Sequence, residues 1–592
     1  MESPKIDRRK FLTGALATGA ATALGAIGLT GCSPQASEND KESTASTADQ
    51  ASSTPSPADW LGEAPAITDE DCSETIDTDV LVVGAGCSGW FAACAAAEQG
   101  ANVLLIEKYE TGAGVRGSAL GAIDSRKQKE AGVTIDKEEL LNDYARYACN
   151  QNNMDLVRLW ADNSGEALDW YCDRVDGVKD IQVDLEYNMP SEDLRYKAYP
   201  TGHGTIIMRE EMGKDNRSCE APTVEVLTEY FLSFAGAKLM YETGMDRLIQ
   251  NEDGAVVGAY ASTSDGTRMR INAKNGVIVA TGGYANNFAM YEALQGELVK
   301  SLVGVVPFAN FNAQGEGIKA CMWAGARFDD VKTTMVFDRG IMKPDQEIGH
   351  PFDMDFDYFQ FATQPFLKVD SVGNRICNES SPYDYVVHAA SMKGNRAWYP
   401  VWDANWKEDV HRFHTVGCST LEIREGGKIL FLELGVGYNP VNLDGTEANI
   451  EANIEAGKVV KADTIEELAE KLGFDVDAFK KTVDTYNSLY DAQEDTQYGK
   501  EAFRLSEMRT APFYGVKIGG LALCTLDGIK INTDFQALNE KNEPIEGLYV
   551  IGNDSGSYYA HTYPNLGAGS NAGRCATFGR MCGKALASKN NA

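Results

Sequence analysis

The first part of the chain with the pattern of a buried strand begins near residue 79. Asp79–Val83 is short, apolar and rich in β-branched residues, as expected for a parallel strand covered on both faces. Helix-forming residues follow from Trp90 to Gln99, Gly100 is placed to end that helix, and Ala101–Ile106 is apolar again. The pattern predicts a strand, a helix and a second strand in close succession, as in doubly wound α/β proteins.

A glycine-rich turn joins the first predicted strand to the helix, because residues 84–89 read G-A-G-C-S-G. Gly84 permits a tight turn, Gly86 lets the backbone approach a pyrophosphate, and Gly89 lets helix and strand pack closely. The helix N-terminus offers N–H groups to phosphates. Glu107, at the end of the second strand, is placed to accept hydrogen bonds from ribose hydroxyls. Together these residues predict a Rossmann-type dinucleotide site.

Two later strands decide between the dinucleotides FAD and NAD. Val277–Val279 and Gly547–Ile551 are apolar runs that each lead into a glycine turn. Large flavoproteins close their sheet with such distant segments, which nicotinamide enzymes rarely need, so FAD is the predicted cofactor. Ser570–Gly573 is expected to begin a helix aimed at a flavin carbonyl. The residues expected to contact FAD are Gly84, Gly86, Ser88, Gly89, Glu107, Lys108, Ser118, Ala280, Thr281, Gly282, Gly283, Asn553, Asp554, Ser570 and Asn571.

The N-terminus has the pattern of a twin-arginine export signal over residues 1–32. The arginine pair in Asp7–Leu12 precedes a run, Thr13–Thr30, that has too many Gly and Thr residues for a membrane-spanning helix. Leu29–Cys32 resembles a lipoprotein processing site, with Cys32 as the lipidated first residue of the mature chain. Residues 33–74 are rich in Ser, Thr, Ala, Asp and Pro, which predicts a flexible linker. We therefore expect an exported protein, anchored by lipid at the outer face of the cytoplasmic membrane or in the cell envelope.

Charge and cysteine content exclude several classes of function. The 592-residue chain has 87 acidic and 54 basic residues, a net charge of −33, which repels nucleic acid. Its 13 cysteines show no spacing typical of haem attachment, iron–sulfur clusters or zinc, so no metal site is expected. Electrons must then come from an external donor, such as a cytochrome or a quinol-linked protein.

Together with further landmarks, these segments resemble the superfamily of FAD-dependent fumarate reductases and 3-ketosteroid dehydrogenases. The landmarks are Gln314–Gly317, Gly373–Glu379 and Thr577–Gly579. The resemblance implies an α/β fold in which an α+β capping domain is inserted into a Rossmann-type FAD-binding domain, with the active site between them. The implied boundaries are 75–330 and 517–592 for the FAD-binding domain and 331–516 for the capping domain, in which Asp463–Tyr490 is expected to be helical.

The resemblance also implies the site residues. Fumarate reductases of this type hold a dicarboxylate with histidines and arginines, and one arginine donates a proton; here Tyr383 stands at that position, and Asn565 replaces another arginine. In 3-ketosteroid dehydrogenases, a tyrosine after an Asn-Glu-x-x-Pro run exchanges a proton with carbon. A second tyrosine and the N–H of a glycine four residues later bind the ketone oxygen. Tyr383, Tyr563 and Gly567 match this pattern.

The implied reaction is reduction of a C=C bond conjugated to a carbonyl. Hydride would reach the β-carbon, Tyr383 would protonate the α-carbon, and Tyr563 and the Gly567 N–H would stabilise negative charge on the oxygen. A tyrosine hydroxyl carries its proton at neutral pH, which favours reduction. Three alternatives stay open: a dehydrogenase that forms such a bond, a fumarate reductase-like enzyme for another unsaturated acid, and a flavin electron carrier.

Four other residues lie near the predicted site or carry suggestive chemistry. His561 and His203 are expected to be structural rather than catalytic. Arg116 and Arg339 are weaker candidates for contact with an anionic substrate or with the flavin.

The export hypothesis predicts a localisation defect. Replacing Arg8 and Arg9 with lysine should trap the precursor inside the cell, because a twin-arginine signal depends on the arginine pair. Fractionation of cells and mass spectrometry of the N-terminus measure the outcome. Exported protein that still begins with Met1 would contradict processing before Cys32.

Overall fold

The computed structural model describes most of the chain, and its elements lie in one compact unit, Thr54–Ala592. The described residues are 60–113, 120–185, 195–207, 220–296, 303–305, 313–348, 357–413, 421–422, 424–425, 428–429 and 441–589. The predicted export signal with Cys32, most of the predicted linker, Arg116 and Ser118 lie outside them. Among the described residues, no helix combines the length and the apolar composition needed to cross a bilayer.

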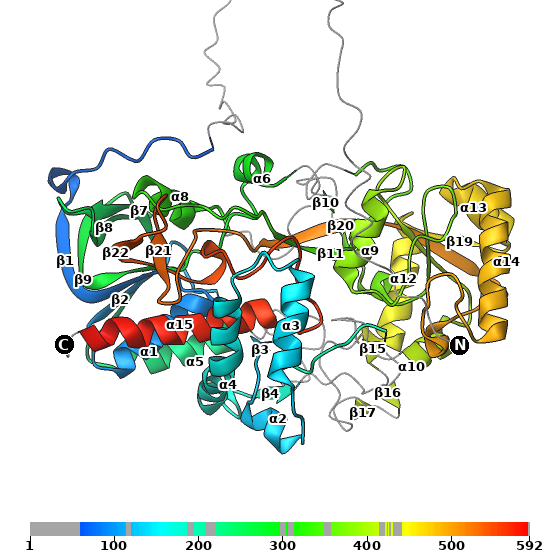
Figure 1. Ribbon diagram of the computed structural model, residues 1–592, viewed down its shortest axis with the longest axis horizontal. Helices are drawn as coiled ribbons and strands as arrows, with labels where there is room; N and C mark the ends of the chain where they lie inside the picture. The colour runs from blue at the N-terminus through cyan, green and yellow to red at the C-terminus, as the bar shows by residue number, and fades with distance from the viewer. Residues whose placement is uncertain are drawn as a thin grey trace, which may run out of the picture. The chain divides into compact units, whose positions relative to one another are not determined.

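The predicted dinucleotide unit forms the centre of the largest sheet (Figure 1). Its strands are β1 (Glu74–Val83), β2 (Val103–Ile106), β6 (Ala237–Met240), β7 (Thr243–Gln250), β8 (Val256–Thr263), β9 (Arg268–Val279), β21 (Gln536–Leu538) and β22 (Pro544–Val550). They follow the order β21-β22-β9-β1-β2-β6, with β8 on β9 and β7 on β8. β1 pairs in parallel with β2 and β9, and β22 pairs in parallel with β9. Distant parts of the chain meet in one sheet, which confirms the Rossmann-type α/β fold.

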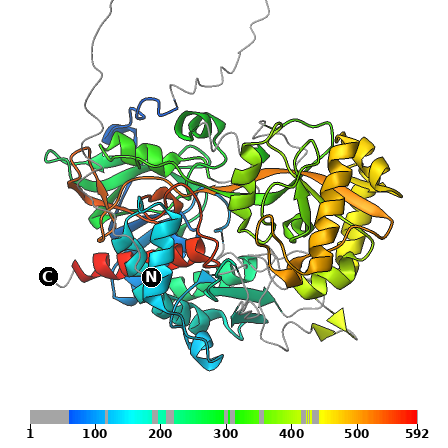
Figure 2. The same cartoon turned by 45° about the vertical axis from the view of Figure 1, so that its right-hand side comes forward.

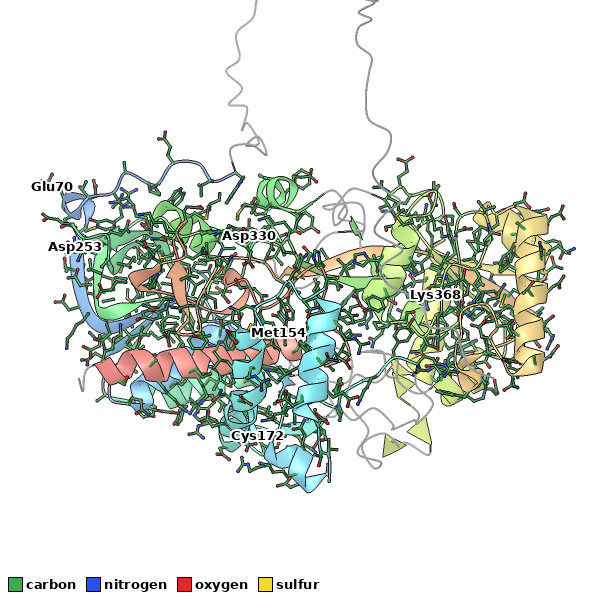
Figure 3. All side chains as sticks on the ribbon, in the orientation of Figure 1. Glu70, Met154, Cys172, Asp253, Asp330 and Lys368 are labelled. Carbon is green, nitrogen blue, oxygen red and sulfur yellow. The ribbon has the colours of Figure 1, made fainter. Side chains whose placement is uncertain are left out.

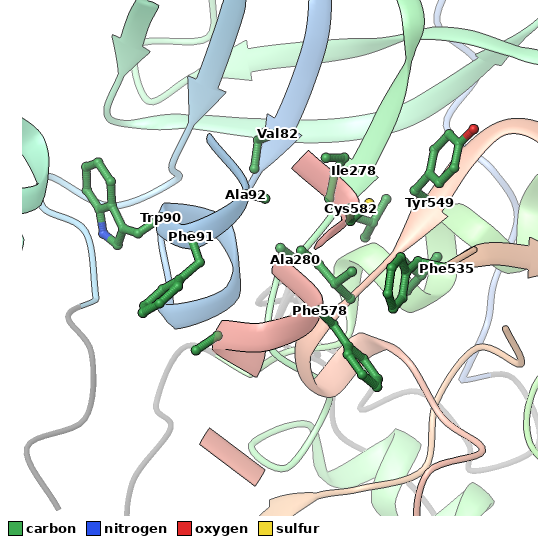
Figure 4. Packing of buried hydrophobic residues seen from close by; sticks show 14 of the residues in the cluster. Val82, Trp90, Phe91, Ala92, Ile278, Ala280, Phe535, Tyr549, Phe578 and Cys582 are labelled. Carbon is green, nitrogen blue, oxygen red and sulfur yellow. The ribbon is translucent and has the colours of Figure 1, made fainter. Parts of the chain in front are cut away.

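Two helices, α1 (Cys87–Glu98) and α15 (Ser570–Ser588), pack closely because glycines of α15 face α1. A Cβ at Gly583 would overlap the Ala92 carbonyl oxygen, and a Cβ at Gly579 would lie 2.5 Å from the Ser88 carbonyl oxygen. Side chains from both helices and from β1 and β9 share one buried apolar cluster (Figure 4). The C-terminal helix is thereby held against the dinucleotide helix.

A second, mostly antiparallel sheet is built around the long strand β20 (Figure 2). Its strands are β10 (Val303–Val305), β11 (Thr334–Met342), β12 (Asp357–Tyr358), β13 (Leu367–Val369), β14 (Tyr399–Trp402), β19 (Val459–Ala462) and β20 (Phe513–Thr525). β20 pairs antiparallel with β11, β14 and β19 and parallel with β10. The boundary predicted after residue 516 falls inside β20, whose pairing with β11 continues to Thr525. The strand therefore continues without a break from one side of the predicted boundary to the other.

Five helices accompany the second sheet in sequence. They are α9 (Tyr383–Ser391), α10 (Trp406–Phe413), α12 (Leu443–Glu455), α13 (Ile465–Leu472) and α14 (Val476–Ala492). The Thr464 hydroxyl accepts a hydrogen bond from the Glu467 N–H at 3.1 Å and begins α13, while the Asp475 carboxylate caps α14. The helices predicted between Asp463 and Tyr490 are confirmed.

The remaining elements form a small antiparallel sheet, several helices and two short strand pairs. The small sheet has the order β3-β5-β4. Its strands are β3 (Leu120–Gly121), β4 (Ile181–Leu185) and β5 (Gly202–Ile207). The helices are α2 (Arg126–Glu130), α3 (Lys137–Tyr147), α4 (Met154–Val175), α5 (Glu220–Leu232), α6 (Phe288–Leu294) and α8 (Glu316–Trp323). The strand pairs join β15 (Leu421–Glu422) to β18 (Val441–Asn442) and β16 (Arg424–Glu425) to β17 (Lys428–Ile429).

The segment just before β1 packs onto the main sheet. Asp69, in a single 3-10 turn, accepts a hydrogen bond from the Tyr260 hydroxyl at 2.7 Å and pairs with Arg270. Ile67 is buried in a cluster with Tyr260 and Ile249. The prediction of a flexible linker is wrong for this last stretch, because its polar and apolar side chains have partners on β7, β8 and β9.

A buried group of charges supports the chain just before α9. The Arg375 guanidinium binds Glu379 through two nitrogens at 2.8 Å each, and it also binds Asp495 at 2.7 Å. Lys500 Nζ lies 3.3 Å from Glu379 Oε2, an oxygen that also accepts from Arg375. Burial raises the pKa of Glu379, but Lys500 and Arg375 lower it by more, so the carboxylate is held ionised. Lys368, labelled in Figure 3, is buried on β13 of the same sheet.

Glu379→Gln should lower the free energy of unfolding by about 3–5 kcal/mol, because it leaves Arg375 and Lys500 buried with less compensating charge. The pKa of Glu379 is lowered in the folded state, so its stabilising contribution is present above the unfolded pKa and is lost on acidification. Thermal and urea unfolding measure the loss. Glu467→Gln is a matched control, because Glu467 pairs with Lys471 at the same four-residue spacing on the surface. Equal effects of the two variants would show that burial of the network contributes nothing.

Candidate active site

The turn after β1 leaves open space where the sequence predicts a pyrophosphate. Gly84 has φ +101°, and a Cβ there would lie 2.5 Å from the Ala280 carbonyl oxygen. A Cβ at Gly89 would overlap the Gly84 carbonyl oxygen, so protein packing alone requires glycine at both positions. Gly86, the N-cap of α1, differs because a Cβ there would meet no protein atom within 4 Å. The space beside this helix N-terminus fits a phosphate group.

Glu107 and Lys108 follow β2 beside this turn. The Glu107 carboxylate accepts hydrogen bonds from the Ala85 N–H at 2.8 Å and the Tyr109 N–H at 3.1 Å. Each carboxylate oxygen has further lone pairs, so Glu107 can also accept from a ribose hydroxyl. Lys108 forms a 2.5 Å ion pair with Glu316 at the start of α8, which gives its ammonium group a partner within the protein. The structure thus connects Lys108 to the Gln314–Gly317 landmark.

The side chain of Asp554 binds the predicted turn at Thr281–Gly283. Its buried carboxylate accepts from the N–H groups of Thr281, Gly282 at 3.1 Å and Gly283 at 3.0 Å, and from the Thr281 hydroxyl at 2.9 Å. Burial raises the pKa of Asp554, and these hydrogen bonds partly offset that rise. Since both carboxylate oxygens are engaged by the turn, Asp554 shapes the cofactor site through the backbone that it holds.

The start of α15 supplies polar atoms to the same region. The Asn571 Nδ2 group donates to Asn553 Oδ1 at 3.0 Å, whereas its buried Oδ1 atom has no hydrogen-bond partner among the described residues. An unsatisfied buried acceptor fits a ligand that carries an N–H group, as the flavin ring system does. Ser570 instead lies 3.1 Å from the Tyr559 hydroxyl. The open space at Gly86 and the Asn571 acceptor together fit a bound FAD.

Tyr383 is the first residue of α9 and is almost completely buried. Its ring packs edge-on against Phe337 of β11, with ring centroids 4.8 Å apart. The Arg339 guanidinium, also buried, lies 4.8 Å from the Phe337 centroid and 5.8 Å from the Tyr383 centroid. The predicted proton donor is therefore set in an aromatic environment with one cation close by.

Tyr563 is buried in the same apolar cluster as Tyr383 and Phe337. Its ring lies 5.6 Å from the Tyr559 ring. The Gly567 N–H donates to the Pro564 carbonyl oxygen at 3.2 Å within a turn. A backbone N–H makes one strong hydrogen bond, so the predicted bond from Gly567 to a substrate carbonyl stays a prediction that requires this turn bond to be exchanged. A Cβ at Gly567 would lie 2.5 Å from the Tyr144 hydroxyl, so a larger residue there would have to displace that ring.

One hydrogen bond brings the segments of the two tyrosines together. The Thr562 hydroxyl donates to the Asp384 carboxylate, across 178 positions of sequence. Thr562 directly precedes Tyr563, and Asp384 directly follows Tyr383. The structure therefore joins the two segments that carry the predicted catalytic tyrosines, which no local pattern in the sequence required.

The two histidines have structural surroundings. His203 is fully buried on β5, where burial lowers its pKa to about 4, and it lies 2.8 Å from Ser125 Oγ. His561 is exposed and contacts the Gln151 side chain at 2.8 Å. Among the described residues, no group of His, Cys, Asp and Glu side chains could hold a metal ion.

Two site residues were missed by sequence analysis. Arg574 is fully buried and donates to the Gly552 carbonyl oxygen at 3.0 Å and to Asn553 Oδ1 at 3.2 Å. An arginine among the small residues of the first turns of α15 was the signal that could have revealed it. Asp384 gave no such signal, because acidic residues are common in the first turn of helices.

Comparison with known proteins agrees with this geometry. The family described as FAD binding domain matches residues 79–570. The chain belongs to this FAD-binding family. Its predicted cofactor, FAD, is confirmed, and the protein is an FAD-dependent oxidoreductase of the class acting on CH–CH groups.

Several relatives and solved structures match most of the length of this chain. It is 27% identical to a vinyl phenol reductase of Lactiplantibacillus plantarum, covering 82% of this chain and 92% of that protein. It is 24% identical to a digoxin reductase of Eggerthella lenta, covering 98% and 97%. A 3-ketosteroid dehydrogenase structure from Rhodococcus jostii matches with a TM-score of 0.63 and 19% identity, covering 88% of this chain and 99% of that one. An open flavocytochrome c3 fumarate reductase structure matches with a TM-score of 0.60 and 22% identity, covering 87% and 79%.

Gly86→Ala should weaken FAD binding by about tenfold or more, which corresponds to about 1.4 kcal/mol. The new methyl group would enter the space beside the helix N-terminus without touching protein atoms, so the apoprotein should keep its melting temperature. Flavin absorbance after reconstitution measures the bound FAD. Gly296→Ala is the control, because its Cβ would also meet no protein atom within 4 Å. Undiminished FAD binding by Gly86→Ala would place the pyrophosphate elsewhere.

Proposed function

We propose that the protein reduces a C=C bond conjugated to a carbonyl group. In this reaction Tyr383 supplies the proton to the α-carbon, and Tyr563 donates a hydrogen bond to the carbonyl oxygen. The observation that supports the proposal is the hydrogen bond from Thr562 to Asp384, which joins the segments that carry these two buried tyrosines. Reduced FAD, when bound, supplies the hydride that completes the addition of two electrons and two protons.

The chemistry requires the two tyrosines to have different tasks. Negative charge grows on the carbonyl oxygen as hydride reaches the β-carbon, and the Tyr563 hydroxyl can stabilise it because it is held in a water-poor environment. The α-carbon then needs a proton, which a tyrosine hydroxyl carries at neutral pH. The Gly567 N–H takes no part in this proposal, because it is bonded to Pro564.

The surroundings of Tyr383 favour a largely neutral substrate. Phe337 and Tyr383 form an aromatic wall, and Asn565 stands where fumarate reductases of the resembling type have an arginine. The relatives named above, a vinyl phenol reductase and a digoxin reductase, support a reductase of unsaturated, ring-containing compounds. A steroid-like or phenolic enone is the kind of substrate that such a wall would contact through its rings.

A second candidate is reduction of an unsaturated monocarboxylic acid. It is favoured by Arg339, whose buried guanidinium lies within 5.8 Å of the Tyr383 ring centroid and could attract a carboxylate. A urocanate reductase of Eggerthella lenta is also among the relatives, at 25% identity. Asp338 lies 3.8 Å from Arg339 and reduces the net positive charge available to a dianion. A dehydrogenase that runs the same chemistry in reverse remains a further alternative.

The proposal includes the location and the electron supply. The arginine pair Arg8-Arg9 and the processing site before Cys32 support export and lipid anchoring, with a cytochrome or quinol-linked protein as the donor of a respiratory pathway. NADH is an alternative donor, since one relative is an NADH:acrylate oxidoreductase of Vibrio harveyi.

Anaerobic reoxidation of the dye-reduced enzyme tests the substrate class directly. The panel should contain steroid enones, phenolic enones, vinyl phenol, urocanate, acrylate and fumarate. Rapid flavin reoxidation by enones, with saturated product formed in equal amount, supports the proposal. Reoxidation by carboxylic acids alone would transfer the assignment to the second candidate, and reoxidation by no compound in the presence of a fully reducible flavin would favour an electron carrier.

Tyr383→Phe should lower kcat by about 10²- to 10⁴-fold, the usual contribution of a positioned proton donor. FAD content and melting temperature should stay unchanged, because only one hydroxyl is removed. Tyr399→Phe is a matched control, since Tyr399 is equally buried but belongs to the separate cluster of the second sheet.

Tyr563→Phe separates the two roles. It should lower kcat by about 10²- to 10³-fold and also raise KM, because the carbonyl accepts its hydrogen bond before and during the reaction. If Tyr383→Phe turned over a confirmed substrate at the wild-type rate, the proton donor would have to be sought at Arg339 instead.

A further inference from the structure

The Asp384 side chain occupies a junction of three chain segments. It lies in the first turn of α9, and its side chain is buried. One carboxylate oxygen accepts from the Tyr147 hydroxyl at 2.7 Å, and the other accepts from the Thr562 hydroxyl. Tyr147 is the last residue of α3, so the carboxylate joins α3, α9 and the segment after β22.

This junction is adjacent in sequence to both proposed catalytic tyrosines. Asp384 follows Tyr383, and Thr562 precedes Tyr563. A shift of the carboxylate would therefore be transmitted through one peptide unit to each tyrosine. Tyr147 supports the arrangement from the other side, since its ring stacks on Tyr385 of α9 with centroids 4.9 Å apart.

We infer that Asp384 is a positioning residue, which holds Tyr383 and Tyr563 in mutual register by binding Tyr147 and Thr562 with a single carboxylate. The inference rests on the proposed function, because it gives Asp384 its effect through those two tyrosines. Misplacement of reacting groups by about 1 Å can lower rates by about 100-fold. The two hydrogen bonds that hold the tyrosine segments in place should therefore have a large effect on turnover.

The charge state of Asp384 determines how strong its hydrogen bonds with Tyr147 and Thr562 are. Burial raises the pKa of Asp384 to about 7, although the hydrogen bonds from Thr562 and Tyr147 lower it. Among the described residues, the titratable groups on these three segments include Tyr147 on α3, Tyr383, Tyr385 and His388 on α9, and His561 before Thr562. The His561 imidazole contacts Gln151. Hydrogen bonds to an ionised acceptor are about twice as strong as neutral ones. The two hydrogen bonds to Asp384 therefore become stronger as pH rises through 7 and the carboxyl group ionises.

The stability effect has the opposite sign. The folded-state pKa of Asp384 is raised above its ordinary value, so its protonated form is favoured by folding. Its contribution to stability is present at low pH and is lost as pH rises through about 7. A pH range in which turnover improves while stability falls would be the signature of this carboxylate.

Asp384→Asn in the FAD-loaded enzyme tests the inference with dye as electron donor and the best enone of the panel. The kcat should fall about 10- to 100-fold above pH 7. The deficit should shrink below pH 6, where the wild-type side chain is also neutral. Asp409→Asn is the matched control, because Asp409 is a buried carboxyl on α10 with a raised pKa, and its partner is Arg412. A deficit of equal size at every pH, or an equal deficit in the control, would overturn the inference.

Two further measurements keep failure of the inference distinct from failure of the proposed function. In a Tyr383→Phe background, Asp384→Asn should cause a smaller additional loss of kcat than in the wild-type enzyme, because only its effect through Tyr563 remains. If Tyr383→Phe is crippled and Asp384→Asn alone keeps the wild-type rate, only the inference fails. If Tyr383→Phe is fully active, the proposed function fails first.

Hydrogen exchange gives a readout that is independent of turnover. Asp384→Asn should increase amide exchange both at the start of α9 and around Thr562, and Asp409→Asn should not. If Asp384→Asn fails to fold, Thr562→Val removes one of the two hydrogen bonds at nearly constant volume. It should produce the same two-segment increase and a smaller loss of kcat. Unchanged amide exchange in a folded variant would show that Asp384 does not hold these two segments in place.

Discussion

The N–H groups of Thr281, Gly282 and Gly283 converge on one buried carboxylate, that of Asp554. Buried N–H groups need acceptors, so the turn after β9 keeps its shape only while the segment after β22 lies beside it. The same segment is bound by Arg574 of α15, and α15 packs on α1 through glycines. The dinucleotide turn, the second turn and the C-terminal helix therefore form one interdependent site for FAD.

The second sheet depends on a different kind of buried charge. Arg375, Glu379, Asp495 and Lys500 are desolvated together, so each charge is tolerable only with its partners in place. Glu379 stands four positions before Tyr383, which makes the network a rigid support for the start of α9. Asp384, the residue after Tyr383, accepts hydrogen bonds from Tyr147 of α3 and from Thr562, which hold the start of α9 from another direction.

The proposed site is aromatic rather than densely cationic. Tyr383, Phe337 and Tyr563 share a buried cluster, and Arg339 is the cation whose position relative to two of these rings is known. Such a site stabilises charge that develops on a carbonyl oxygen, by hydrogen bonding, better than it would hold a preformed dianion. For this reason the replacement of the family's arginines by Tyr383 and Asn565 favours a carbonyl compound over a dicarboxylate as the proposed substrate.

The sequence by itself determined the dinucleotide unit, because strand periodicity and the glycines at 84, 86 and 89 are local requirements of backbone geometry. It also identified β9, β22 and the helices beginning after Thr464, since apolar runs and capping residues act over a few positions. Resemblance to a family supplied Tyr383 and Tyr563, but the hydrogen bond that joins their segments came from the tertiary structure. Only the fold showed that the Gly567 N–H is engaged, that β20 crosses the predicted boundary, and that Asp384 meets Tyr147 and Thr562. These contacts join residues far apart in the chain, and their energies depend on burial, which no local pattern specifies.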